Sequence, residues 1–220
     1  MAFNVNELAA EIANRGVLKT NKFLVEFPMP LSLRNNTQFS MLSGINRDMS
    51  LYCESTNLPG VAVLLEEIRR YGYGPNEKKP HTAIFSDVNL TFRGDANGEI
   101  WTFLNSWMKC TTNYESRGDW NTPSGPVLGQ TPGEVGYKYD PENNEGYATD
   151  VTIRIFDETS MEVMRVVLRE AYPVFVGDVP LNWASRSDYM RIPVTLTFFD
   201  WYNDFVPINN TGNIRSQQPQ

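Results

Sequence analysis

The sequence predicts a mainly β protein: an antiparallel β-barrel or sandwich with a long hairpin and one or two peripheral α-helices. Three observations lead to this fold class. Runs of alternating apolar and polar residues recur along the chain, turn-forming residues separate them, and only two segments show helical spacing. Hydrophobic residues make up 41% of the 220 residues and aromatic residues 12%, which is enough to bury a core. We therefore expect a single domain over residues 1–220.

The first elements are expected to be a short helix and two strands. Residues 5–15 show helical spacing and end at Gly16, which suits a helix terminus. Residues 22–27 alternate and predict a strand, whereas residues 28–48 are polar and predict a loop. Residues 50–56 predict a second strand.

The next segment begins at a strong turn signal, Asn-Leu-Pro-Gly at residues 57–60. Residues 61–74 fit both a helix and a strand. The β-branched start and the flanking glycines favour the strand.

A cleaner strand and a helix follow. Residues 82–94 predict one strand, and four apolar residues share one of its faces: Ile84, Val88, Leu90 and Phe92. Residues 99–110 have apolar residues at helical spacing, with Asn97 or Asp95 as the cap. We expect an amphipathic helix there.

Residues 113–147 predict a long acidic loop. The segment is rich in Gly and Pro, shows no periodicity, and carries six acidic against two basic residues, hence −4 of the net charge of −7. Such a segment is expected to add little to the core.

The C-terminal part predicts a hairpin and a closing strand. Residues 148–156 and 161–170 flank a turn at 157–160 and read as a long β-hairpin. The dipeptide Tyr172-Pro173 is expected to end its second strand, and a further turn is expected within residues 174–183. Residues 191–202 predict the last strand, with one apolar face formed by Ile192, Val194, Leu196 and Phe198. Residues 203–220 predict a polar C-terminal tail.

The residues that carry most chemistry are scarce. His81 is the single histidine and predicts a surface position near a turn. Cys53 and Cys110 have no metal-ligand spacing and predict reduced, packed thiols. Residues 125–131 resemble a phosphate loop faintly, but they lack its lysine. We therefore predict no catalytic, cofactor-binding or metal-binding residues and no enzymatic activity.

The charge and the hydropathy pattern limit the partners. An acidic chain is a poor candidate for gripping nucleic acid, because phosphate affinity comes mainly from clustered Lys and Arg. Neither a signal peptide nor an apolar stretch long enough to span a bilayer is visible, so we expect a protein made and folded in a cytosol without a membrane partner. Nucleic acid could still pass by without specific binding.

The order of elements resembles the tail tube proteins of contractile-tailed phages of the T-even type, a family similar in fold to the tubes of pyocins and type VI secretion. About half of the chain carries the resemblance. The hairpin followed by an aromatic-Pro segment, a Val-Gly-Asp turn, a Trp and a closing aromatic-rich strand is its most specific part. The matching stretches are residues 21–27, 52–60, 100–108, 149–183 and 192–202.

The resemblance implies a structural virion protein in the tail, assembled in the host cytoplasm. Six subunits would form each ring, and stacked rings would form the inner tube through which DNA is ejected, with sheath and baseplate proteins as partners. The physics agrees, since a hairpin-rich domain exposes strand edges that ring closure would cover. The family has no catalytic residues that could be transferred to this chain.

Two other readings remain open at this stage. The chain is longer than typical members in residues 28–48, 113–147 and after 203, which also suits a baseplate protein that initiates the tube. A different class, a carbohydrate-binding or hydrolytic β-sandwich, would use the aromatic residues at strand ends, Trp183, Trp201 and Tyr202, as a sugar platform. Core or subunit-interface packing is the favoured role for these three side chains.

Overall fold

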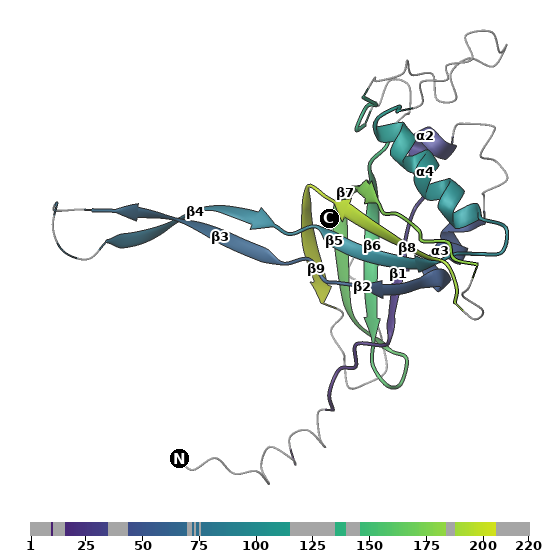
Figure 1. The fold of residues 1–220 in the computed structure, drawn as a ribbon. Coiled ribbons are helices and arrows are strands. Elements are labelled where there is room, and N and C mark those ends of the chain that lie inside the picture. The colour runs from purple at the N-terminus through teal and green to yellow at the C-terminus, as the bar shows by residue number, and fades with distance from the viewer. Residues whose placement is uncertain are drawn as a thin grey trace, which may run out of the picture.

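The computed structural model of the chain describes residues 10, 16–34, 44–69, 72, 74, 76–114, 135–139, 146–183 and 188–205. Two parts are plain in Figure 1: a body of sheets and helices, and a two-stranded arm that projects from it. The predicted helix at 5–15 lies outside the described residues apart from Ala10.

The body is built on a seven-stranded antiparallel sheet that folds into a sandwich-like arrangement without closing into a barrel. Sheet A contains β1 (Phe23–Glu26), β6 (Thr149–Phe156), β7 (Glu162–Val176) and β9 (Asp200–Phe205), in that order. Sheet B contains β2 (Cys53–Thr56), β5 (Val88–Arg93), β8 (Arg191–Thr197) and the C-terminal end of β7. The mainly β, antiparallel fold class is confirmed.

Strand β7 is long enough to belong to both sheets. Its first part pairs with β6 and β9, and its last part pairs with β8. The prediction that Tyr172-Pro173 ends this strand is wrong, because pairing continues to Val176. Pro173 is tolerated at a register shift between Pro173 and Phe175, where the loss of one ladder hydrogen bond costs little.

Three helices are described: α2 (Leu31–Arg34), α3 (Ile45–Tyr52) and α4 (Glu99–Thr111). The prediction of a loop over 28–48 is wrong at α2 and at the start of α3, and residues 50–52 of the second predicted strand end that helix instead. Ile45 and Met49 are four residues apart and buried, so packing of this short apolar stripe outweighs its polar composition.

The predicted amphipathic helix is confirmed as α4. Gly98 occupies its N-cap position, and the side chain of Asp95 supplies the capping hydrogen bonds. The carboxylate of Asp95 accepts hydrogen bonds from the backbone N–H groups of Asn97, Glu99 and Ile100, at 3.1, 3.0 and 3.0 Å. Gly98 takes a φ of 72°, a left-handed conformation that favours glycine. These bonds satisfy the first backbone donors of the helix.

Two predicted strands are each divided in the structure. The segment 82–94 splits at residues 86–87: its first part belongs to β4 (Glu77–Phe85) of the arm, and its second part is β5. Ile84 is therefore exposed, while Val88, Leu90 and Phe92 are buried as predicted. The segment 191–202 splits into β8 and β9, which follow one another along β7, and Phe199 N–H donates to the Arg169 carbonyl between them.

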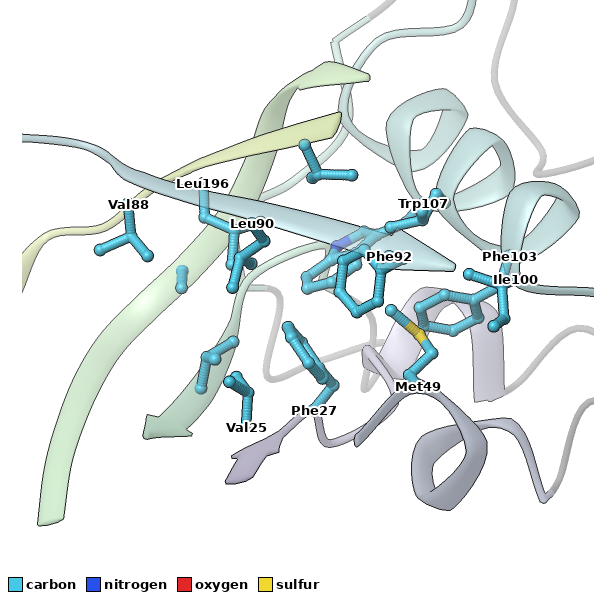
Figure 2. Packing of buried hydrophobic residues seen from close by; sticks show 14 of the residues in the cluster. Val25, Phe27, Met49, Val88, Leu90, Phe92, Ile100, Phe103, Trp107 and Leu196 are labelled. Carbon is cyan, nitrogen blue, oxygen red and sulfur yellow. The ribbon is translucent and has the colours of Figure 1, made fainter. Parts of the chain in front are cut away.

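The core lies between the sheets and helices α3 and α4. Figure 2 shows Phe27, Met49 and Trp107 gathered around Phe92, and the Phe27 and Phe92 ring centroids are 5.4 Å apart. The indole N–H of Trp107 donates to the Tyr147 carbonyl at 2.7 Å. The end of the predicted 113–147 loop therefore closes one side of the core.

Candidate assembly surfaces

The arm is the most exposed element of the described chain. It is formed by β3 (Val61–Ile68) and β4, which pair only with each other among the described strands (Figure 1). At its base, Ser86 N–H donates to the Gly60 carbonyl at 3.0 Å, and Gly60 N–H donates to Ser86 Oγ at 2.9 Å. A Cβ on Gly60 would lie 2.7 Å from Ser86 Oγ, so a side chain here would displace the hydroxyl that accepts the Gly60 N–H.

The half of the arm next to the body is apolar and solvent-exposed. Leu64 is 48% exposed and Val63 53%, and the other large apolar side chains there are Val61, Leu65 and Ile84. An isolated two-stranded hairpin is marginal in water, and a continuous exposed apolar patch marks an interaction site. The proximal arm is therefore a candidate surface for contact with another protein chain.

The half of the arm near its tip is charged instead. Register pairs Glu66 with Lys79 and Glu67 with Lys78, and the Lys78 ammonium lies 3.8 Å from a Glu67 carboxylate oxygen. These polar side chains keep the tip soluble and separate it in chemistry from the proximal half.

Sheet A offers a second candidate surface, its two outer edges. β1 pairs with β6 alone, and β9 pairs with β7 alone, so each leaves a row of backbone groups without a strand partner among the described residues. Since successive strands of the sheet are antiparallel, β1 and β9 also run antiparallel to each other. Such edges are templates for pairing with another chain.

The two faces of sheet A differ in character. Val151, Ile153 and Leu168 point to the core, together with the buried residues of α3 and α4. The residues between them along the strands, which include Arg154 and Arg165, form the opposite face. We call this opposite face the polar face of sheet A.

Ion pairs cross the polar face from strand to strand. Arg154 contacts Glu26 at 2.8 Å and Glu162 at 3.4 Å. Arg165 contacts Glu162 at 2.7 Å and Asp204 at 3.9 Å.

A further ion pair joins Arg169 and Asp200 across β7 and β9. The hydrogen bond from Arg169 holds the pKa of Asp200 below its usual value. The hydrogen bond to Glu162 raises the pKa of Arg165, so both shifts favour the charged form of the side chain. All three arginines of this face therefore have carboxylate partners.

The residues that the sequence singles out for chemistry are not brought together. His81 is exposed on β4, no disulfide joins Cys53 and Cys110, and residues 125–131 lie outside the described residues. Burial raises the pKa of Cys53 to about 12, so the thiol is protonated at neutral pH. Within the described ranges no group of three or more His, Cys, Asp or Glu could hold a metal ion. No helix in this part of the chain has the length and apolar character needed to cross a membrane.

The three aromatic residues of the sugar-platform reading are also separated. Trp201 packs against the core, whereas its neighbour Tyr202 lies on the polar face. Trp183 lies fully exposed in the loop between β7 and β8. Trp201 is therefore core packing, as favoured from the sequence, and the structure provides no joint aromatic platform from these three side chains.

Sequence reasoning missed the arm and the ion pairs. The arm has a signal, since residues 61–65 are apolar at every position instead of alternating, which does not fit a strand with one exposed face. The ion pairs have no comparable signal, because they depend on the register between four strands.

Comparison with known proteins agrees with this architecture. The sequence model of the family described as "Phage tail tube protein" matches residues 18–204, which is more than half of the chain. The chain belongs to the phage tail tube protein family. The match extends from just before β1 into β9, so it includes both sheets and the arm. The family consists of structural tube proteins.

Solved structures share the tail tube fold at low sequence identity. A chain of the anti-feeding prophage baseplate, solved with six-fold symmetrisation, has a TM-score of 0.53 and 14% identity, covering 87% of this chain and 98% of that one. A chain of the anti-feeding prophage tube-terminating cap has a TM-score of 0.51 and 12% identity, covering 86% and 91%. No curated protein matches the chain.

Proposed function

We propose that this tail tube protein forms hexameric rings that stack into the inner tube of a contractile phage tail, the conduit for DNA ejection. The observation that carries this proposal is the four-stranded sheet A in a chain of this family. Its two edges are antiparallel to each other and have no further strand partner among the described residues. The six-fold symmetrised baseplate that contains a similar fold supports six copies per ring.

Ring closure follows from the two free edges of sheet A. When copies stand side by side in the same orientation, β9 of one copy meets β1 of the next as an antiparallel neighbour. Six copies of four strands give a closed wall of 24 strands, with a circumference of about 115 Å at about 4.8 Å per strand. The bore between backbones is then about 37 Å wide before strand tilt, which widens it further. That width accommodates a DNA duplex after side chains are added.

The bulk of each subunit favours one face of sheet A for the inside of the ring. Helices α3 and α4 pack against its core-facing side, and sheet B continues from β7 on that side (Figure 1). A closed wall has less room inside than outside, so this bulk belongs outside. The polar face then lines the bore.

The arm supplies the contact that side-by-side closure does not use. It extends well beyond the body, and its exposed apolar half has a hydrophobic reason to dock on a neighbouring copy. Contacts of this kind are heterologous, so repetition produces an open stack of rings.

This role requires partners but no chemistry of its own. Sheath and baseplate proteins would contact the outside of the tube, and DNA would pass through it without specific binding. The protein would catalyse no reaction, would be assembled in the host cytoplasm and would end in the virion tail.

An arm deletion tests the assembly. Because Gly60 and Ser86 are hydrogen-bonded to each other, residues 62–84 can be replaced by an Asn-Gly turn without opening the body. We expect the wild type to form rings or tubes with six-fold class averages in negative-stain microscopy at high concentration. The arm deletion should melt at a similar temperature but form no tubes. His81→Ser is the control within the arm and should still form tubes. A wild type that remains a soluble monomer in light scattering under all conditions would contradict the proposal.

A baseplate tube initiator of the same fold is the second candidate. The two similar structures named above come from a baseplate and a cap. An initiator would be present as one ring per particle, whereas a main tube subunit would be among the most abundant virion proteins. Quantitative mass spectrometry of purified particles separates the two.

A further inference from the structure

The polar face of sheet A carries positive charges that do not suit a conduit for DNA. Arg154, Arg165 and Arg169 all lie on this face, which gives 3 × 6 = 18 arginines in a ring of six. Arginines spaced along a surface bind phosphates, and DNA affinity rises steeply with the number of phosphates neutralised. Unpaired, these side chains would hold DNA against the wall.

The strand register brings two of the arginines side by side and also places a carboxylate between them. Arg154 and Arg165 are directly opposite each other on β6 and β7, a like-charge pair that is unfavourable by itself. Glu162 lies between them and contacts both guanidinium groups, at 3.4 and 2.7 Å. Glu26 and Asp204 contact the outer sides of the two arginines.

The ion pairs of this face contain more acids than bases. Four carboxylates, those of Glu26, Glu162, Asp200 and Asp204, accompany the three arginines, so these seven residues sum to 3 − 4 = −1. The guanidinium groups are thus engaged, and the residual charge repels phosphate.

Subunit stability is a weak reason for the ion pairs that Asp200 and Asp204 of β9 make. The side chains of Asp204 and Arg169 are 58% and 51% exposed, and exposed ion pairs typically stabilise a fold by only about 0–1 kcal/mol. These ion pairs should therefore matter mainly for a molecule that passes along the polar face.

We propose that the carboxylates of the polar face mask its arginines, so that duplex DNA slides past the wall without binding. Asp200 masks Arg169, Asp204 and Glu162 mask Arg165, and Glu26 and Glu162 mask Arg154. The orientation of the face toward DNA rests on the proposed tube function, whereas the masking itself is a property of the subunit surface.

The test removes the two masking carboxylates of β9, which are the partner of Arg169 and one of the two partners of Arg165, and leaves the arginines in place. The variant Asp200→Asn/Asp204→Asn is compared with the wild type and with Asp87→Asn/Asp178→Asn, which removes two exposed acids away from the polar face. Binding of a fluorescent DNA duplex is followed by anisotropy at 50 and 200 mM salt, on assembled and on unassembled protein.

We expect the wild type and the control to leave the DNA free. The Asp200→Asn/Asp204→Asn variant should bind it. If Arg169, which loses its ion-pair partner, neutralises one phosphate, the affinity should fall about 3.5-fold between the two salt concentrations, as the counterion slope predicts. Adding Arg165→Gln and Arg169→Gln to the variant should abolish binding. The proposal is overturned if the variant does not bind DNA, or if the control binds it equally well.

Two further readouts keep the test decisive. Thermal melting reports whether the variant folds, and Asp200→Asn alone repeats the comparison with one acid if the double substitution unfolds the protein. Microscopy reports tube formation separately. A wild type that forms no tubes contradicts the proposed function, while DNA binding by the unassembled variant still decides the masking.

Discussion

The two long hairpins of this protein share a local structure and differ in surroundings. In the β6–β7 hairpin, alternate residues such as Ile153 and Leu168 are buried against the helices and sheet B. In the β3–β4 arm, apolar residues such as Leu64 stay about half exposed. Both are antiparallel, and both contain β-branched and leucine residues suited to strands.

The difference separates residues that fold the subunit from residues that assemble it. A buried side chain of β7 is stabilised within its own chain, so its loss costs folding free energy. An exposed apolar side chain of the arm gains burial only when another chain covers it. The predictions below run from the largest expected change in subunit stability to the smallest.

Leu168→Ala in β7 should have the largest effect. Leu168 is fully buried, and a Leu→Ala cavity in a core costs about 2–5 kcal/mol of unfolding free energy. Urea unfolding of the purified subunit, read by tryptophan fluorescence, measures it. A loss below about 1 kcal/mol would mean that the side chain of Leu168 is not packed in the core.

Replacing residues 115–146 with a Gly-Ser linker should have the next effect. From composition alone, we expect no change in melting temperature. The structure changes this expectation, because Gly136 N–H donates to the Thr111 carbonyl at 2.9 Å and Gly146 N–H to Ser32 Oγ at 3.0 Å. Losing these and neighbouring hydrogen bonds should cost about 2 kcal/mol.

The matched control for that change is a shorter replacement. A linker in place of 115–134 keeps those contacts and should melt like the wild type, since loop-closure entropy changes slowly with length. Equal melting temperatures for the two replacements would show that 135–146 adds nothing to subunit stability.

Asp95→Ala should cost about 1 kcal/mol, the usual value of a helix N-cap. Burial raises the pKa of Asp95, but the backbone hydrogen bonds from Glu99 and Ile100 outweigh it, so the pKa lies below its usual value. The cap therefore stabilises the protein fully above the unfolded pKa of about 3.9, and this contribution is lost as the pH falls through the lower folded pKa. Melting curves of both proteins between about pH 2 and 7 should converge at the acid end.

Leu64→Ser/Leu65→Ser in the arm should change subunit stability least, by about 0.5 kcal/mol or less. The same variant should lose tube formation in negative-stain microscopy, while Thr82→Ser on the same arm should keep it. A large drop in melting temperature together with intact tubes would reverse the distinction between the two hairpins.

Much of the fold was predictable because its elements carry local signals. Val88, Leu90 and Phe92 alternate with polar residues, and Ile100, Phe103 and Trp107 recur at helical spacing, so their burial followed from periodicity. Helix α3 was missed because its apolar stripe consists of few residues in a polar segment. The breaks at residues 86–87 and 198–199 were missed because the apolar runs on either side resemble one continuous strand, although Ser86 and Asp200 stand where the alternation requires an apolar residue.

The sequence by itself determined the class of this protein: antiparallel strands, a capped helix, a hairpin around residues 157–160, and an order of elements that resembles tail tube proteins. These features are set by side-chain periodicity and turn chemistry within a few residues. Only the tertiary structure decided that the arm stands clear of the core and that each arginine of the polar face meets a carboxylate. Both depend on the register and crossing of strands far apart in the chain, such as Glu26 on β1 beside Arg154 on β6, and no local pattern specifies those contacts.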